Sequence, residues 1–489
     1  MLSAMKQLLI YLYSTLLTAL IITGCQSSSQ TGYAPATEER IKQVENSLGD
    51  WVRTQYDTIW NLEERMKHHN ITGVSIAVVH DFKLDWAKGY GWADLSEQRP
   101  VTEKTLFQAA SISKSLNSVG VLKLVQDGKL DLHTDINQYL TSWKFPYDSV
   151  AGGKTITVAA LLSHTAGLTI HGFPGYARGD TLPSVQQILD GEKPTNTKAV
   201  RSFIEPDSAV VYSGGGTTIT QLIVTDVTGL PYDEFMQKNV LDPLGMKTSS
   251  YRQPPAGIDS SLLATGYRAD GTPVEGKYHI YPEQAAAGLW TNPTELSRYI
   301  IETALSWNGK SKKVLSPEYT RLRLDTIIGD AGLGVFISGN DTSLYFSHSG
   351  GNEGFTCYYI GDILTGNGMV IMTNSDNGSL LSEVANSVAT VYGWKDYYKP
   401  VLKTVVDVDE ATLERYTGTY AADESTFTVK REGNKLLISP YPGFWVNVYF
   451  TSDTDFFVRE SQGDMKFMID DKGMVTGFIA EGTLIRKID

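Results

Sequence analysis

The residues of this sequence best suited to chemistry are Ser111 and Lys114, three positions apart in QAASISKS, residues 108–115. An apolar run over residues 116–125 and a stop at Asp127-Gly128 predict a helix with Ser111 in its first turn. Side chains at this spacing share one helix face. A serine hydroxyl becomes a nucleophile when a base takes its proton, and a lysine serves as that base when burial keeps it neutral.

The spacing alone does not identify a site. Ordinary residue usage gives S-x-x-K about twice in a chain of this length, and a second copy is present at Ser3-Ala4-Met5-Lys6. That copy lies in the N-terminal targeting segment described below, so it has no part in the chemistry. Other motifs of the chain must therefore decide whether Ser111 is a nucleophile.

Length and charge limit the class of protein. A chain of 489 residues is too long for one hydrophobic core and predicts two or three domains. Its composition, 41% hydrophobic and 20% charged, is that of a globular protein. The formal charge of −13 argues against nucleic acid or anionic phospholipid as a natural partner, because an acidic surface repels both.

The N-terminus resembles a bacterial lipoprotein export signal. Residues 1–24 hold Lys6 and an apolar stretch shorter than a membrane-spanning helix, and Ile22-Thr23-Gly24-Cys25 resembles a lipobox. We therefore expect lipidation of Cys25, export, and membrane anchoring in the bacterial cell envelope, facing the periplasm or the exterior. An uncleaved anchor is the alternative. The second cysteine, Cys357, lies in a predicted strand and is expected to be a packed thiol.

Hydrophobic periodicity predicts an α+β fold. Residues 38–67 have helical spacing with a break near Gly49, and residues 74–79 and 84–90 form a predicted hairpin. A mainly helical region follows, with a long irregular passage over residues 171–207. Strands predicted at 333–337, 343–348, 354–360 and 368–373, with a turn at 349–352, form an antiparallel meander before a helix at 380–392. An antiparallel sheet flanked by helices, plus an all-helical region, is the expected fold.

The domain boundaries follow from these patterns. Residues 1–24 are the signal peptide, 25–50 a tether and the start of the N-terminal helix, and 51–395 the large α+β domain. Residues 396–405 form a linker. About eight short strands at regular spacing over 406–489 predict a small all-β barrel, whose aromatic residues are expected to form its core.

Two further fragments are candidates for the site. Tyr212-Ser213-Gly214 stands at the start of a predicted helix, where the alternative is a core tyrosine beside a tight turn. His348-Ser349-Gly350 lies at the end of a predicted strand. His164, in residues 161–168, is expected to order its turn through hydrogen bonds rather than to take part in chemistry.

In this order, these fragments resemble the signature motifs of the serine β-lactamase and penicillin-binding-protein superfamily, most closely its class C β-lactamase-related branch of esterases and D-amino-acid peptidases. Residues 161–168, 241–246 and 287–290 add further landmarks. The resemblance covers about residues 60–395, and residues 406–489 resemble the lipocalin-like barrels of some relatives. It implies a β-lactamase/transpeptidase-like fold.

The resemblance also implies a role for each site residue. Ser111 forms the acyl-enzyme, Lys114 accepts its proton, and Tyr212 relays a proton to the leaving group. His348, where many relatives have lysine, supplies positive or hydrogen-bonding character or binds a substrate carboxylate. The backbone amides of Ser111 and Gly351 form the oxyanion hole, and a substrate-binding role falls to Gly350, Ser213 and Gly214. Neither a metal nor a cofactor is expected.

Two departures from the family pattern narrow the expected function. The family's usual asparagine is Gly214 here, and its Lys-Thr-Gly motif is His348-Ser349-Gly350. Both differences favour a serine hydrolase acting on an ester or amide, of the esterase or D-amino-acid peptidase and carboxypeptidase type, with a small molecule or peptide as substrate. A true β-lactamase is one alternative. A non-catalytic penicillin-binding or sensor protein is the other.

Overall fold

The computed structural model describes residues 32–422, 425–441, 444–480 and 482–489. The predicted signal peptide and Cys25 lie outside these ranges. Within them, every helix is too short or too polar to span a lipid bilayer.

An antiparallel sheet, built from strands of the early and the late part of the domain, forms the centre of the large domain. Its strand order is β4-β3-β2-β10-β9-β8-β7. The strands are β2 (Gly73–His80), β3 (Lys83–Asp94), β4 (Arg99–Pro100), β7 (Phe336–Asn340), β8 (Ser343–Asn352), β9 (Phe355–Asp362) and β10 (Gly368–Thr373). The predicted hairpin is β2 and β3, and β10 pairs antiparallel with β2, which joins the early and late parts of the domain in one sheet. The expected α+β class is confirmed.

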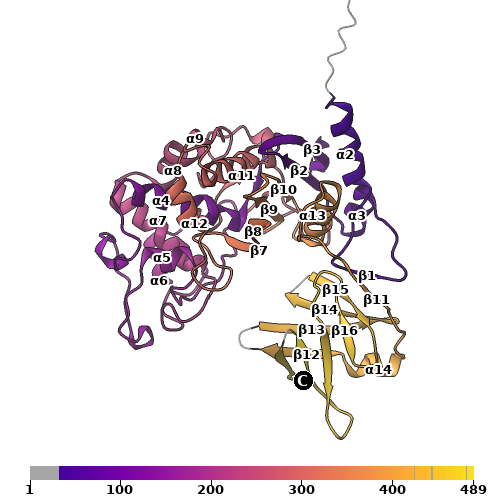
Figure 1. The fold of residues 1–489 in the computed structure, drawn as a ribbon. Coiled ribbons are helices and arrows are strands. Elements are labelled where there is room, and N and C mark those ends of the chain that lie inside the picture. The colour runs from indigo at the N-terminus through magenta and orange to yellow at the C-terminus, as the bar shows by residue number, and fades with distance from the viewer. Residues whose placement is uncertain (1–31, 423–424, 442–443, 481) are drawn as a thin grey trace, which may run out of the picture. The chain divides into compact units, whose positions relative to one another are not determined.

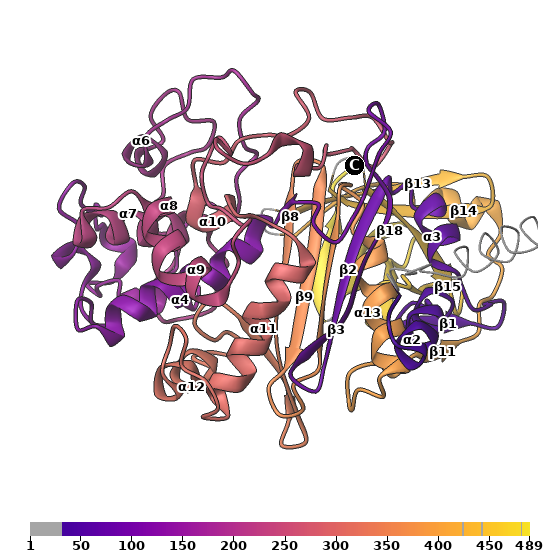
Figure 2. The ribbon, with the colours of Figure 1, turned by 90° about the horizontal axis from the view of Figure 1, so that it is seen from above.

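Helices cover both faces of this sheet. Helix α11 (Pro293–Trp307) lies on one face and α13 (Ser379–Val391) on the other (Figure 2). Successive side chains of a strand point to opposite faces. In β10, Val370 and Met372 accordingly join the core on the α11 side, whereas Met369 and Ile371 join the core that contains α13 residues.

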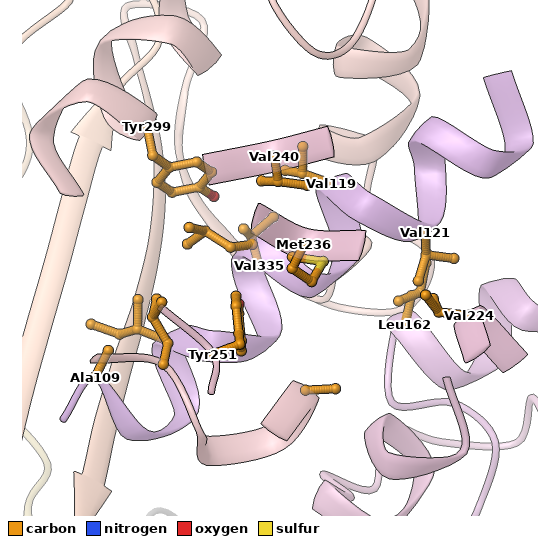
Figure 3. Close-up of a cluster of buried hydrophobic side chains, with 14 of the residues drawn as sticks. Ala109, Val119, Val121, Leu162, Val224, Met236, Val240, Tyr251, Tyr299 and Val335 are labelled. Atoms are coloured by element: carbon orange, nitrogen blue, oxygen red, sulfur yellow. The ribbon is translucent and has the colours of Figure 1, made fainter. Parts of the chain in front are cut away.

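The helical region is built around α4 (Ser113–Gln126), which continues from the short 3-10 helix η1 (Ala110–Ile112). Val119 and Val121 of α4 point in different directions into the surrounding core, toward Val240 and toward Leu162 and Val224 (Figure 3). A helix buried on nearly every side needs apolar or small residues all round. The neighbouring helices are α5 (Val158–Leu162), α6 (Val185–Asp190), α7 (Gly214–Thr228), α8 (Tyr232–Met236), α9 (Asp242–Leu244), α10 (Gln284–Ala287) and α12 (Pro317–Leu324).

The prediction of an amphipathic helix over residues 38–67 is wrong in its middle part. The chain forms α2 (Pro35–Glu45), the short strand β1 (Val52–Thr54) and α3 (Leu62–His68). Strand β1 pairs in parallel with β11 (Val401–Lys403), far away in the sequence. Tyr56 and Ile59, counted in the apolar helical pattern, are 76% and 66% exposed. A long-range strand pairing thus overrides the local periodicity.

The predicted turn at residues 349–352 is also wrong, because β8 continues through it to Asn352. Glycines in a strand interior often mark a close approach of another backbone. A Cβ atom on Gly350 would lie 2.5 Å from the carbonyl oxygen of Ala109. The glycine pair therefore reflects close packing of β8 against the segment that carries Ser111.

The C-terminal residues form the expected barrel. Helix α14 (Glu410–Arg415) precedes a closed barrel of β12 (Gly418–Ala422), β13 (Ser425–Glu432), β14 (Lys435–Tyr441), β15 (Phe444–Phe450), β16 (Asp455–Phe457), β17 (Met465–Ile469), β18 (Val475–Ala480) and β19 (Thr483–Lys487) (Figure 1). The ring of Phe467 stacks on Tyr416 at 3.8 Å and on Phe456 at 4.4 Å. These rings belong to the packed core of the barrel, as expected for its aromatic residues, whereas Trp445 and Tyr449 are only partly buried.

Candidate active site

Ser111 lies in the short helix η1, directly after strand β5 (Phe107–Gln108), which pairs with β6 (Trp290–Thr291). The preceding residue, Ala110, is fully buried and has a φ of 45°, in the left-handed region. This conformation costs a residue with a side chain about 1–2 kcal/mol. The surrounding core thus holds a sharp backbone bend immediately before the half-buried Ser111.

Lys114 is placed to act on Ser111. Its Nζ lies 2.9 Å from Ser111 Oγ and 2.8 Å from the carbonyl oxygen of Ala286 in helix α10. The side chain is buried, with 3% of the residue exposed. The Ala286 carbonyl fixes the amine on one side, which leaves it directed at the serine hydroxyl.

Tyr212 completes the predicted group. It stands just before α7, whose first turn is capped by Ser213, because Ser213 Oγ accepts a hydrogen bond of 2.9 Å from the amide of Gly216. Lys114 Nζ lies 5.0 Å from the centroid of the Tyr212 ring. The structure therefore brings Ser111, Lys114 and Tyr212 together from segments a hundred residues apart.

His348 in β8 faces the same ring, with 6.1 Å between the centroids of His348 and Tyr212. Its Nδ1 donates a hydrogen bond of 2.6 Å to the carbonyl oxygen of Ser349, and its buried Nε2 has no partner among the described residues. Burial, and then the charge of Lys114, lower the pKa of His348 to about 3. At neutral pH His348 is thus an uncharged imidazole, and it offers no cation for a substrate carboxylate.

The glycines of the third motif lie beside the backbone of Ser111. A Cβ atom on Gly350 would lie 3.0 Å from the amide nitrogen of Ser111, whereas one on Gly351 would meet open space. The first amides of a helix have no partner within that helix. This geometry is compatible with the oxyanion hole predicted from the amides of Ser111 and Gly351.

His164 was expected to order its own turn through hydrogen bonds, but its side chain bonds to the Tyr212-Ser213-Gly214 segment. Its Nδ1 accepts a hydrogen bond of 3.2 Å from the amide of Ser213, and its ring lies 4.3 Å from that of Tyr212. Burial, with a smaller contribution from Lys114, lowers the pKa of His164 well below its usual value. A neutral, buried imidazole therefore positions Tyr212 and the motif that follows it.

Gly214, which stands where the family usually has asparagine, lies in a tight space. A Cβ atom on Gly214 would lie 3.0 Å from the carbonyl oxygen of His171 and 3.1 Å from Cε2 of Phe173. Both residues belong to the long irregular passage over residues 171–207. His171 lies 4.8 Å from Tyr212, ring to ring, and sequence reasoning missed it.

Glu283 is a second residue that sequence reasoning missed. It directly precedes α10, the helix whose Ala286 carbonyl holds Lys114. Its side chain is fully buried, and within the described residues neither carboxyl oxygen has a hydrogen-bond partner. Burial raises the pKa of Glu283 to about 8. The segment Tyr281-Pro282-Glu283-Gln284 carries no pattern that would have indicated this.

Glu283→Gln is expected to stabilise the protein above neutral pH. The folded state raises the pKa of Glu283, so the wild type loses stability as the pH rises from about 4.5 to 8, by about 3 kcal/mol at pH 7. Glutamine carries no ionisable proton and escapes this loss. Urea unfolding at pH 5 and pH 8 should show a gain for Glu283→Gln that is small at pH 5 and large at pH 8.

Glu295→Gln is the matched control for this measurement. The Glu295 carboxylate is also buried, but it accepts hydrogen bonds from the amides of Thr248 at 3.1 Å and Ser249 at 2.9 Å. Its replacement should destabilise the protein at both pH values. A loss of stability in Glu283→Gln at pH 8, similar to that of the control, would contradict the prediction.

The chain is similar to known proteins over most of its large domain. Residues 61–389 match the family described as Beta-lactamase, which is two thirds of the chain's length, and the chain belongs to that family. The resemblance to the superfamily is thereby confirmed, while its assignment to the class C branch stays a prediction.

The chain is also similar to individual proteins. The chain is 25% identical over 403 residues to penicillin-binding protein 4* of Bacillus subtilis (strain 168), covering 78% of this chain and 86% of the relative. It is 27% identical over 330 residues to protein flp of Staphylococcus aureus (strain MRSA252), covering 65% of this chain but only 62% of flp. The structure of D-amino acid amidase from Ochrobactrum anthropi SV3 shares the fold, with a TM-score of 0.56 at 21% identity, over 73% of this chain and 98% of the amidase.

Proposed function

We propose that this protein is a serine hydrolase that forms an acyl-enzyme on Ser111 with an ester or amide substrate. One observation carries the proposal: the buried amine of Lys114 lies 2.9 Å from Ser111 Oγ and is held there by the Ala286 carbonyl. A nucleophile within hydrogen-bond reach of a fixed base is the arrangement that acyl transfer requires.

The proposed reaction has two halves. Ser111 Oγ attacks the carbonyl carbon while its proton passes to Lys114 Nζ, and the oxyanion that forms accepts hydrogen bonds from the amides of Ser111 and Gly351. The bond to the leaving group then breaks, and a proton delivered through Tyr212 neutralises the departing oxygen or nitrogen. Water attacks the acyl-enzyme in the second half, the same groups take its proton, and Ser111 Oγ regains a proton as the acid leaves.

The substrate we propose is a simple or peptidyl ester or amide, including D-amino-acid derivatives, rather than a β-lactam. Gly214 offers no side-chain amide, and the neutral imidazole of His348 offers no positive charge for the carboxylate that penicillins and cephalosporins carry. The name of the D-amino acid amidase among the similar structures supports D-amino-acid compounds as candidates. The name of the penicillin-binding protein, in contrast, supports binding of a β-lactam.

The test is a panel of substrates with the purified protein: p-nitrophenyl esters, D-amino-acid p-nitroanilides and the β-lactam nitrocefin. We expect turnover of esters or anilides that exceeds nitrocefin turnover by at least about tenfold, because the β-lactam loses both the amide and the cationic contact. Faster nitrocefin hydrolysis would instead support a β-lactamase. A single stoichiometric acylation without turnover would support a binding or sensor protein.

A further inference from the structure

A short loop, residues 169–173, lies against the start of helix α7 and is fixed there by hydrogen bonds. The amide of Gly214 donates to the His171 carbonyl at 3.0 Å, and the amide of Gly215 donates to the Ile170 carbonyl at 3.0 Å. Ser213 Oγ donates to the Thr169 carbonyl at 2.8 Å. The loop is thus held directly against the Tyr212-Ser213-Gly214 motif.

The backbone of this loop is strained at Ile170, which has a φ of 65°. A β-branched residue in the left-handed region is a genuine outlier, and such residues persist where the surrounding contacts over-determine the conformation. Here the Gly215 amide holds the carbonyl of Ile170 itself. The strained conformation fixes the backbone from which the next side chain, His171, projects.

His171 differs from the other imidazoles around Tyr212 in its access to solvent. The rings of His164 and His348 are buried, whereas His171 is exposed, with its ring 4.8 Å from that of Tyr212. Burial of part of the ring, and then the charge of Lys114, lower the pKa of His171. His171 therefore lies within the electrostatic reach of Lys114 and presents an exposed imidazole beside Tyr212.

The loop also packs closely against Gly214, where the family usually has an asparagine that can bind substrate. A Cβ atom at position 214 would lie tightly against the His171 carbonyl and the Phe173 ring, so an asparagine there would require these neighbours to shift by a few tenths of an ångström. The same loop carries the imidazole of His171 beside Tyr212, 4.8 Å from ring to ring. A neutral imidazole has one donor and one acceptor nitrogen.

We propose that His171 is a substrate-binding residue, which donates a hydrogen bond from its imidazole to the carbonyl oxygen of an acylamino group next to the scissile bond. The imidazole N–H of His171 suits a carbonyl oxygen, which can only accept hydrogen bonds. The substrate class is therefore N-acylated or peptidyl esters and amides. This inference rests on the proposed acyl transfer by Ser111.

The experiment compares two esters with the same leaving group, N-acetyl-D-alanine p-nitrophenyl ester and p-nitrophenyl acetate, which lacks the acylamino group. In His171→Leu, kcat/KM should fall about tenfold for the acylamino ester, the value of one hydrogen bond, and stay within about twofold for the acetate. His171→Gln keeps an N–H donor of similar reach and should restore most of the loss. His133→Leu, at an exposed histidine of another loop, is the control and should leave both rates unchanged.

The pattern of losses shows which part of the substrate, if any, His171 contacts. Equal loss for both esters would show that His171 acts on the reacting groups and not on the acylamino carbonyl, and no loss for either would show that it does not contact substrate. Both results overturn the inference. Labelling of Ser111 by a small fluorophosphonate is measured in the same variants. Failure of the wild type to label overturns the proposed acyl transfer itself, so the two failures are distinguishable.

Discussion

Ser111→Ala is expected to lower kcat for the best ester by a factor on the order of 10⁴ to 10⁶. The variant is expected to keep the fold. Ser111 is only half-buried, and Lys114, which loses its hydrogen bond to Ser111 Oγ, keeps its hydrogen bond to the Ala286 carbonyl. It loses the oxygen that forms the covalent bond. Residual catalysis would come from substrate binding and the oxyanion donors alone.

The measurement pairs steady-state kinetics with intact-mass analysis after treatment with a fluorophosphonate. The wild type should gain one adduct, and Ser111→Ala should gain none. Ser260→Ala, at an exposed serine before Ser261, is the matched control and should label and turn over like the wild type. An adduct of unchanged yield in Ser111→Ala would show that another residue is the nucleophile.

Much of the fold could be predicted because apolar residues recur at the spacing typical of strands or helices in most segments. The β2–β3 hairpin follows from alternating apolar residues and a polar turn, and the barrel follows from evenly spaced short strands. The failures lie where distant segments decide the structure. Strand β1 exists because it pairs with β11, about 350 positions away, and β8 extends to Asn352 because Gly350 packs on Ala109.

The candidate site divides in the same way. Ser111 and Lys114 are a local pattern on one helical turn, and Tyr212 and His348 were found because their short motifs occur in a known order. The protonation state of His348 follows from its burial beside Lys114, which its motif does not encode. His171 was missed because its position against Gly214 depends on the path of a loop. The only sequence signal was the glycine itself, where a side chain was expected.

Glu283 shows a different limit. A glutamate in a polar segment is ordinarily solvated, and nothing in Tyr281-Pro282-Glu283-Gln284 departs from that expectation. The carboxyl is buried at the start of α10, and no described residue gives it a hydrogen-bond partner. Buried ionisable groups of this kind are concentrated near functional sites, where structure is held at a cost in stability.

Tyr212→Phe is expected to lower kcat by a factor of about 10² to 10⁴ for an amide or alkyl ester, the usual contribution of one general acid–base group. Phenylalanine preserves the ring contacts with His164 at 4.3 Å and His171 at 4.8 Å, so the site remains packed and only the hydroxyl is lost. The leaving nitrogen or alkoxide then departs without a proton. Tyr56→Phe, at a tyrosine that is 76% exposed, is the control.

Comparison of two leaving groups distinguishes a role of Tyr212 in proton transfer from a role in packing. A p-nitrophenolate is stable as an anion near neutral pH, so its departure needs no proton and the Tyr212→Phe defect should be much smaller for p-nitrophenyl esters than for matched anilides. The measurement is kcat/KM for both leaving groups on one acyl group. If the hydroxyl only positioned Lys114, activation of Ser111 would suffer equally with both leaving groups, and the two defects would be the same. A ratio of defects well above one therefore assigns the proton of the leaving group to Tyr212, and a ratio of one removes that role from it.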